Sequence, residues 1–539
     1  MGNNEFKLTK LALALGVTLS LSGCLSDDDK NDTVPEPPVP TVDVPVADTP
    51  EDLTFYVSGN VVQKSTGNPI AATIMFFQDG SPSENVVDID GNAITSITTE
   101  DGSFTFNLAS SDVSTLKMIV SSDEFISKTS VLDFSEVDDS EPFEAFVQLT
   151  KLDDTVTSAS GTGTTTSGQL AEELTVSADA DSSSASVAIG TDVVLQDADG
   201  NAISDGDISL SIVTADVDAA SGKAKAIDLV PDGLNESSTT TVQVPVSMMN
   251  VELKAGDTKV KNFSSPISLT ASLPATVNGQ AISEGDSLSV MSYNEDTGEW
   301  APEDSVTVDA DGNATVSTDH LSGWPFLWSF PACTAVPTFA LGGYPGSVPL
   351  IIDIDTPQFS YSRRIKSGSG NLFLRAAAKY GLWNTLNARV SVRDLLGNSW
   401  GFSSQLVCGA ISIPVVQPYE IVSENINVTY SCSNASEDFQ DNTYPFTGAL
   451  VKYAQSNRIK TAASGSEGSY SLIGLQSGSE YDVVFTPRGV DVDEQTFTIT
   501  ADGNDETFNI VRDNCEVEEV PVTGGTGGTG GTGGNGNGG

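Results

Sequence analysis

Alternating apolar and polar positions recur along most of the chain and predict β-strands. Phe55, Val57, Gly59 and Val61 fall on one face of such a strand, because successive side chains of a strand point to opposite faces. After residue 24 no apolar stripe with helical spacing extends beyond two turns. The chain is therefore predicted to be all-β, with several β-sandwich domains in a row, a disordered N-terminal spacer and a Gly-rich C-terminal tail.

Shifts in composition and turn signals divide the chain into segments. Pro35, Pro37, Pro38 and Pro40 keep the first spacer extended, and the Gly, Thr and Asn of the tail cannot form a core. The predicted segments are a lipoprotein signal peptide at 1–23, an acidic Pro-rich spacer at 24–51, a sandwich at 52–153, a Thr/Ser/Gly linker or loosely paired edge at 154–172, a longer sandwich at 173–331, a less acidic β domain at 332–430, a second small sandwich at 432–516 and a disordered tail at 517–539.

Two of these segments share a pattern. The strand-entering turn Glu100-Asp101-Gly102-Ser103-Phe104 is matched by Ser466-Glu467-Gly468-Ser469-Tyr470, and a G-L-x-x-G-x-x-Y-x-V hairpin is expected from Gly474 to Val483. With the V-x-G-x-V pattern at 57–61, these motifs resemble the carboxypeptidase regulatory-like domain, a small transthyretin-type β-sandwich. The resemblance implies an accessory sandwich rather than a peptidase, and no H-x-x-E zinc motif occurs in the chain.

The longer segment at 173–331 resembles a module of bacterial surface proteins. Tyr293 and Trp300 flank the turn from Asn294 to Glu299, so their rings are expected to pack across a hairpin. Strands are also predicted at 348–354, 372–377 and 388–392 in the less acidic domain.

The N-terminus carries an export pattern. Lys7 and Lys10 precede an apolar run from Leu11 to Leu21, which is shorter than the roughly 20 residues of a membrane-spanning helix. Leu21-Ser22-Gly23-Cys24 resembles the lipobox of bacterial lipoproteins, which implies cleavage before Cys24 and lipid on its thiol. An ordinary signal peptide that contains a cysteine is the alternative.

The resemblance also implies a location. Leu25 stands where Asp would favour retention in the inner membrane, so the lipid-anchored chain is expected at the outer membrane, on its periplasmic or its cell-surface side. The membrane would then be a partner of the chain through lipidated Cys24.

Charge excludes one class of partner. The 539 residues include only 24 Lys and Arg against 74 Asp and Glu, a formal net charge of −50. Nucleic-acid binding needs basic faces that neutralise phosphates, so no nucleic-acid partner is expected.

Four cysteines remain beyond Cys24, an even number in an exported chain, and predict two disulfides. Three pairings are open. The preferred one joins Cys333 to Cys408 and Cys432 to Cys515, because each bond would then bracket one predicted domain.

A D-x-D-G-N pattern occurs three times and has two interpretations, a calcium site and a tight turn. Calcium needs six or more oxygens and one such turn supplies two or three, whereas Asp-Gly and Gly-Asn are also what tight turns require. Plain turns are preferred and Ca²⁺ is kept as the alternative cofactor; its carboxylates would be Asp88, Asp90, Asp197, Asp199, Asp309 and Asp311.

The less acidic domain is the best candidate for a ligand surface. Aromatic faces stack on sugars, and Arg pairs with carboxylates or sulfates, so an acidic glycan or a neighbouring acidic domain would suit it. The candidate residues are Arg363, Arg364, Arg375, Tyr380, Trp383 and Trp400. The preferred interpretation is that these residues form a core and a solvated face without a ligand.

Catalysis finds little support in the sequence. His320 is the only histidine, and no G-x-S-x-G motif accompanies it. The preferred hypothesis is a lipid-anchored, non-enzymatic surface protein with a structural, adhesive or ligand-presenting role. The alternatives are a glycan-binding accessory lipoprotein of a polysaccharide uptake system and an exported hydrolase with an unrecognised site.

Overall fold

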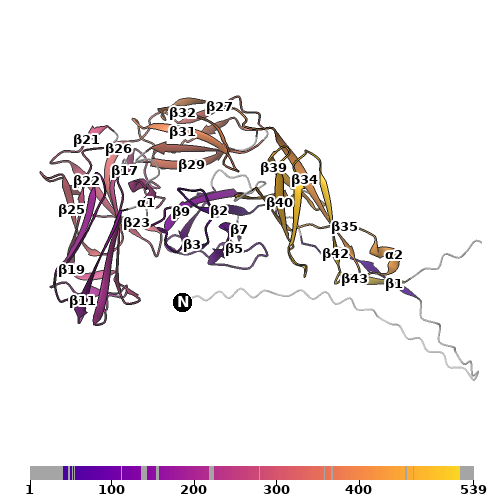
Figure 1. Ribbon diagram of the computed structural model, residues 1–539, viewed down its shortest axis with the longest axis horizontal. Helices are drawn as coiled ribbons and strands as arrows, with labels where there is room; N and C mark the ends of the chain where they lie inside the picture. The colour runs from indigo at the N-terminus through magenta and orange to yellow at the C-terminus, as the bar shows by residue number, and fades with distance from the viewer. Residues whose placement is uncertain are drawn as a thin grey trace, which may run out of the picture. The chain divides into compact units, whose positions relative to one another are not determined.

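The computed structural model describes residues 40–46, 49–50, 53, 55–110, 112–134, 143–152, 157–217, 224–277, 279–346, 348–356, 359–365, 368–455, 458–464 and 467–521. Strands dominate this part of the chain, and its only helices are the single turns α1 (Ala226–Leu229) and α2 (Glu437–Gln440). Neither helix of the described residues could cross a membrane. The predicted all-β class is confirmed, and the strands form tandem β-sandwiches (Figure 1).

The first sandwich comprises residues 55–149. One of its sheets has the order β10-β2-β7-β5, and the other has the order β4-β3-β8-β9 with β6 beside β3. Phe76 and Phe106 meet between the sheets with ring centroids 4.7 Å apart. The strands are β2 (Val57–Gln63), β3 (Ala72–Gln78), β4 (Ser81–Pro82), β5 (Val86–Val87), β6 (Ser96–Thr99), β7 (Ser103–Leu108), β8 (Thr115–Ser121), β9 (Lys128–Asp133) and β10 (Phe143–Leu149).

The second sandwich comprises residues 157–331. A sheet with the order β12-β11-β16-β17-β26-β22-β23 faces one with the order β13-β14-β19-β15. Its strands are β11 (Thr157–Thr166), β12 (Gln169–Leu170), β13 (Leu174–Asp179), β14 (Ser184–Ile189), β15 (Leu195–Gln196), β16 (Gly206–Thr214), β17 (Thr241–Ala255), β18 (Thr258–Lys259), β19 (Asn262–Ser272), β20 (Thr276–Val277), β21 (Gln280–Ala281), β22 (Ser287–Asn294), β23 (Glu299–Pro302), β24 (Val306–Thr307), β25 (Asn313–His320) and β26 (Gly323–Pro331).

Of the two alternatives for 154–172, a linker and a loosely paired edge, the paired strand is the one found over most of the segment. Its residues 157–166 form β11, which pairs with β16 in an antiparallel register from Thr157 to Thr165. The Thr, Ser and Gly side chains give no apolar alternation, but backbone hydrogen bonds suffice to hold a strand in a sheet. Small residues also let the second sheet approach, since a Cβ on Gly161 would lie 2.6 Å from the Val176 side chain.

The expected hairpin contact between Tyr293 and Trp300 is confirmed. These residues face each other across β22 and β23, and their ring centroids are 4.8 Å apart.

The third sandwich comprises residues 332–416. Sheets with the orders β30-β27-β33 and β29-β28-β31-β32 enclose its core. β17 and β26 of the second sandwich extend into this core, where they contribute Val242, Val244 and Phe330. The strands are β27 (Thr338–Gly342), β28 (Leu350–Thr356), β29 (Phe359–Ile365), β30 (Asn371–Phe373), β31 (Asn387–Asp394), β32 (Ser399–Leu406) and β33 (Ala410–Pro414). The strand predicted at 372–377 ends at Phe373, and turns follow it.

The fourth sandwich comprises residues 421–515. β34 begins at Ile421 and packs in this sandwich, so the boundary predicted between residues 430 and 432 falls inside a strand. The strands are β34 (Ile421–Cys432), β35 (Tyr444–Pro445), β36 (Leu450–Gln455), β37 (Arg458–Thr461), β38 (Ala463–Ser464), β39 (Ser469–Gln476), β40 (Glu480–Thr486), β41 (Gln495–Thr500) and β42 (Glu506–Arg512).

The first and fourth sandwiches repeat one topology. β2 pairs antiparallel with β7 and parallel with β10, and β34 pairs in the same way with β39 and β42. Gly102 and Gly468 have φ values of +74° and +71°, and their carbonyls accept hydrogen bonds from Val61 and Val428. The shared sequence pattern therefore corresponds to a shared turn against the central strand.

The hairpin predicted from Gly474 to Val483 is wrong. β39 and β40 lie in different sheets, so this segment crosses the sandwich instead of folding back within one sheet. The Tyr481 hydroxyl accepts a hydrogen bond from the Gln476 amide at 2.8 Å and so closes the crossing.

The cysteines pair as preferred from the sequence. Cys333 is bonded to Cys408 and Cys432 to Cys515, with Cα atoms 5.4 and 5.8 Å apart. A further two-stranded sheet pairs β1 (Thr41–Pro45) with β43 (Val517–Pro521), so the predicted spacer contains a strand and the predicted disorder of the tail is wrong for residues 517–521. Residues 41–44 and 518–521 belong to a compact unit separate from the one that contains the sandwiches.

Candidate functional site

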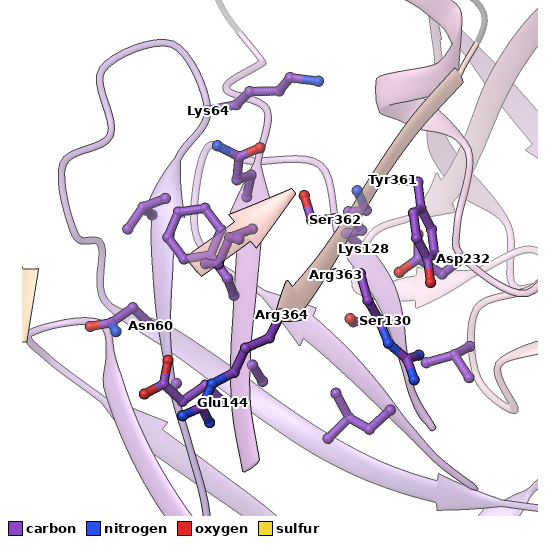
Figure 2. Close-up of a pocket in the computed structure, with 18 of the residues that line it drawn as sticks. Asn60, Lys64, Lys128, Ser130, Glu144, Asp232, Tyr361, Ser362, Arg363 and Arg364 are labelled. Carbon is purple, nitrogen blue, oxygen red and sulfur yellow. The ribbon is translucent and has the colours of Figure 1, made fainter. Parts of the chain in front are cut away.

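A cavity of about 740 Å³ lies within the unit formed by residues 45–517. Its walls come from β2, β9 and β10 of the first sandwich, from β17 and the segment around α1, from β29 and β31, and from β36 and β37 (Figure 2). Its volume falls within the range of roughly 300–1,000 Å³ that is usual for small-molecule sites.

Positive charge gathers at this cavity. Among the described residues, eight Lys and Arg line it, a third of the 24 in the whole chain. The lysines are Lys64, Lys128, Lys379, Lys452 and Lys460, and the arginines are Arg363, Arg364 and Arg393. Five acids share the lining, namely Asp133, Glu144, Asp228, Asp232 and Glu236. The lining thus carries an excess of cations in a chain whose formal net charge is −50.

Glu144 is at the centre of the densest charge cluster. The Lys460 ammonium lies 2.6 Å from its carboxylate, and both side chains are largely buried. Arg364 extends from β29 toward Glu144 (Figure 2). Burial alone would raise the pKa of Glu144, but the charges of Lys460 and Arg364 outweigh it and lower the pKa. Glu144 is therefore held ionised.

Arg393 adds a third cation to this cluster. Its guanidinium binds Asp353 through two nitrogens, at 2.7 and 3.3 Å, and lies over the Phe146 ring at 4.7 Å from the centroid. It also contributes to the lowered pKa of Glu144.

Ion pairs hold other parts of the wall. The Lys379 ammonium lies 2.9 Å from the Asp133 carboxylate, and Lys64 binds Asp228 beside α1. Lys452 donates a hydrogen bond to the Ser103 hydroxyl at 3.1 Å, and burial lowers its pKa. These contacts join residues of different sandwiches.

The structure gathers part of the predicted ligand surface at this cavity. Arg363, Arg364 and Tyr380 line it, with the Arg363 guanidinium 5.9 Å from the Tyr380 ring centroid. Arg375 is exposed and outside the lining. Whether any of them binds a ligand stays a prediction.

The two predicted tryptophans are buried. Trp383 and Trp400 are 0% and 2% exposed and pack in the core of the third sandwich. Trp383 also borders the cavity, whereas Trp400 is outside its lining. Their burial fits the preferred interpretation of a core, because an aromatic side chain serves a core as readily as a surface.

The D-x-D-G-N segments form one kind of turn. In each, the first aspartate (Asp88, Asp197 or Asp309) accepts hydrogen bonds from two backbone amides of its own loop. Gly91, Gly200 and Gly312 take positive φ in the same turns. The second aspartate of each turn (Asp90, Asp199 or Asp311) supplies one of those amides, and the asparagine that ends the pattern supplies the other. The part of the chain that the structure describes contains no cluster of three metal-binding side chains. The geometry matches the plain-turn reading.

His320 has acidic neighbours on both sides of its ring. Nε2 lies 3.5 Å from Glu303, and Nδ1 lies 3.4 Å from Asp319 and 3.2 Å from the Thr318 hydroxyl. The ring also packs on Trp324 at 5.1 Å between centroids. A nucleophilic triad needs a hydroxyl that a substrate can reach, and the Thr318 hydroxyl is buried and donates a hydrogen bond to the His320 carbonyl oxygen at 3.2 Å.

Sequence reasoning missed most of the cavity. Glu144 and Lys460 are 316 residues apart, and neither belongs to a local motif. The only signal was the unusual basic character of residues 359–393, which includes Arg363 and Arg364. Cys24, the predicted lipid attachment site, lies outside the described residues.

No protein-family model matches the chain, and no curated protein matches it. Among solved structures, the minor pilin GBS52 of Streptococcus agalactiae is 10% identical over 35% of this chain and 100% of its own, with a TM-score of 0.18. The full-length RrgB pilus protein of Streptococcus pneumoniae is 9% identical over 88% of this chain and 100% of its own, with a TM-score of 0.15. The pilus adhesin SpaC of Lactobacillus rhamnosus GG is 10% identical over 65% of this chain and 51% of its own, with a TM-score of 0.12. These likenesses are distant, and they carry no inference about function.

Proposed function

We propose that the chain is a lipid-anchored, non-enzymatic protein of the outer membrane that presents a binding surface on a row of β-sandwiches. The observation that carries the binding role is the cavity, which concentrates a third of the chain's Lys and Arg in one concave place. The export pattern that ends at Cys24 and the two disulfides support a location outside the cytoplasm.

Fractionation of cells tests the anchor. We expect the wild-type chain to sediment with outer membranes and the Cys24→Ser variant to appear in the soluble periplasmic fraction. Ser26→Ala, next to the lipobox, is the matched control and should behave as the wild type. Sedimentation of Cys24→Ser with outer membranes would refute the lipid anchor.

A glycan-binding accessory role is the second candidate, and the chemistry of the cavity favours it. Hydroxyl and amide side chains such as Ser58, Asn60, Ser130 and Gln148 line the cavity together with the charged groups. Such groups pair with the hydroxyls of a sugar. Binding of the purified full chain to any member of a panel of neutral and acidic glycans would support this role, and binding to none would leave the structural or adhesive role.

The proposal includes no reaction. Glycosidases need one carboxyl group that is protonated and donates its proton to the leaving group. Glu144 has a lowered pKa and an ammonium on its carboxylate, so it is unsuited to that role. Release of reducing ends from a glycan that the chain binds would instead favour the exported hydrolase.

A further inference from the structure

The first and fourth sandwiches repeat one topology, so the residues of one can be matched with those of the other. Val61 of β2 and Val428 of β34 each donate an amide hydrogen bond to the glycine carbonyl of the shared turn. Aligning the two strands on this bond matches Asn60 with Asn427. The strand that pairs parallel with the central strand is β10 in the first sandwich and β42 in the fourth. The outer face of β2 and β10 therefore corresponds to the outer face of β34 and β42.

In the first sandwich this face joins the sandwiches of the chain to one another. The Glu144 carboxylate lies 2.6 Å from the Lys460 ammonium of the fourth sandwich, and the Asn60 side chain donates a hydrogen bond to a carbonyl of β37 at 3.0 Å. The Arg393 guanidinium of the third sandwich lies over the Phe146 ring. The face is thus a contact surface already in use within one chain.

The matching face of the fourth sandwich is open to solvent. Asp505 corresponds to Glu144, because it binds Asn425 of β34 at the position where Glu144 pairs with Ser58 of β2. We call this surface the β42 face; its residues are all exposed, namely Asp505, Thr507, Asn509 and Val511. Val511 is 67% exposed, which is unusual for an apolar side chain on a strand.

A second exposed surface lies on the third sandwich and continues the contact made by Arg393. Arg389 and Arg393 belong to one face of β31, because residues four apart on a strand share a face. Arg393 covers Phe146, whereas Arg389 is exposed and lies over the Phe402 ring at 4.5 Å from the centroid. The register places Phe402 and Leu406 on the same face, and each is 57% exposed. We call Arg389, Phe402 and Leu406 the β32 face.

The two exposed faces belong to sandwiches of opposite charge. Residues 332–416 contain seven Lys and Arg against three Asp and Glu, whereas residues 421–515 contain five against 14. Within the described part of the chain, neither Arg389 nor Asp505 forms an ion pair. A contact between the β32 face and the β42 face would pair these two charges and bury apolar side chains from both.

We propose that the chain binds a second copy of itself, with the β32 face of one copy against the β42 face of the next. Such a contact uses different surfaces on the two copies, so each copy keeps one face free for another. Each face comprises only a few strand residues, so the contact is weak in solution, and anchoring on a common membrane would favour it by raising the local concentration.

Cross-linking between two cysteine variants tests the proposal. Phe402→Cys and Val511→Cys are made in the full chain with Cys24→Ser, so that no other free thiol is present, and are mixed with a short bis-maleimide. We expect a dimer with one chain of each kind, whose yield rises with protein concentration. Met75→Cys, which is 37% exposed on β3 of the first sandwich, is the matched control. Mixed with Val511→Cys it should give about tenfold less dimer.

Charge reversal tests the pairing itself. Arg389→Glu in the Phe402→Cys chain, or Asp505→Lys in the Val511→Cys chain, should each lower the dimer yield at limiting concentration by about tenfold. The two reversals mixed together should restore the yield, because they exchange the charges across the contact. Arg375→Glu reverses an exposed cation outside the β32 face and should leave the yield unchanged.

Three results would overturn the proposal: a yield no higher than that of the Met75→Cys control, equal dimer from either cysteine variant alone, or no recovery when the two charge reversals are mixed. Equal dimer from one variant alone would indicate a symmetric contact instead. Because the chains lack Cys24 and no ligand is added, the outcome is independent of the lipid anchor and of binding in the cavity.

Discussion

At the scale of single residues, Glu144 is the acid on which the cavity wall most depends. Its carboxylate lies 2.6 Å from the Lys460 ammonium, and the charges of Arg364 and Arg393 also lower its pKa. Removing one partner of a buried ion pair leaves the other charge uncompensated, which typically costs about 3–5 kcal/mol. Glu144→Gln should therefore lower the free energy of unfolding by about that amount in urea titrations.

Two comparisons test the cause of this loss. The double variant Glu144→Gln/Lys460→Met removes both charges and should recover most of the stability. Glu252→Gln breaks the exposed pair with Lys254 and should cost at most about 1 kcal/mol. A loss in Glu144→Gln no larger than in Glu252→Gln would contradict a buried role for the pair.

Asp216 gives a prediction about pH. Its buried carboxylate accepts hydrogen bonds from the Asp181 and Ser182 amides, at 2.8 and 2.9 Å, and from the Ser182 and Ser183 hydroxyls. Burial alone would raise the pKa of Asp216, but the bonds from Ser182 and Ser183 outweigh it and lower the pKa. A carboxyl with a lowered folded-state pKa stabilises the fold above its unfolded pKa of about 3.9, and the stabilisation is lost as pH falls through the folded value.

Asp216→Asn should thus cost about 1–3 kcal/mol at pH 7. Urea unfolding at pH 7 and near pH 3 measures the difference from the wild type, which should shrink at the lower pH. A difference that stays constant or grows on acidification would show that the charge of Asp216 is not what stabilises the turn.

At the scale of elements, Gly102 and Gly468 allow the repeated turn of the first and fourth sandwiches. Both have positive φ, and a Cβ on either would lie 2.5 or 2.6 Å from the carbonyl oxygen of the facing strand. Gly102→Ala should lower the free energy of unfolding by about 1–2 kcal/mol through its backbone conformation and by about 1–3 kcal/mol more through the clash.

Gly312→Ala is the matched control for the turn. Its φ is +80°, but no atom lies within 4 Å of the added Cβ, so only the conformational part should be lost. Thermal unfolding of both variants separates the two contributions. Equal losses in Gly102→Ala and Gly312→Ala would show that close packing against Val61 is unimportant.

Strands and turns whose side chains form a recognisable pattern were predicted well from the sequence. Elements that are held only by backbone hydrogen bonds were predicted poorly. The alternation at 57–61 and the Tyr293–Trp300 pair follow from side chains that pack, and the repeated turn follows from the glycines at its tip. At β11 the sequence left a linker and a paired edge open, because Thr, Ser and Gly leave no apolar signal, whereas the backbone pairs with β16 from Thr157 to Thr165. The segment from Gly474 to Val483 was misread because a turn signal does not say which sheet receives the next strand.

The candidate site was less accessible to sequence reasoning than the fold. Arg363 and Arg364 were found because they lie in one basic stretch, but Glu144, Lys64 and Lys460 come from distant parts of the chain. For Trp383 and Trp400 the sequence left both a core and a ligand surface open, because it shows which side chains are aromatic and not which of them are buried.

At the scale of the whole molecule, the excess of acid should govern the response to salt. A formal net charge of −50 disfavours the compact state through self-repulsion. Raising the ionic strength from 0.01 to 1 M shortens the Debye length from about 30 to about 3 Å and so removes most of this repulsion. The midpoint of the first thermal unfolding transition should therefore rise with NaCl concentration.

The cavity should respond in the opposite direction. An acidic glycan bound there, as the second candidate function proposes, would be attracted by Lys and Arg, and the same salt screens this attraction, so binding should weaken while the fold becomes more stable. Calorimetry of unfolding and of binding, across one series of NaCl concentrations, compares the two trends in the same protein. A midpoint that falls with salt would mean that attractive pairs such as Glu144–Lys460 and Asp133–Lys379 outweigh the repulsion among the acidic surfaces. A midpoint that rises with salt while binding weakens would show that repulsion among acidic groups dominates the whole chain, whereas attraction to Lys and Arg dominates at the cavity.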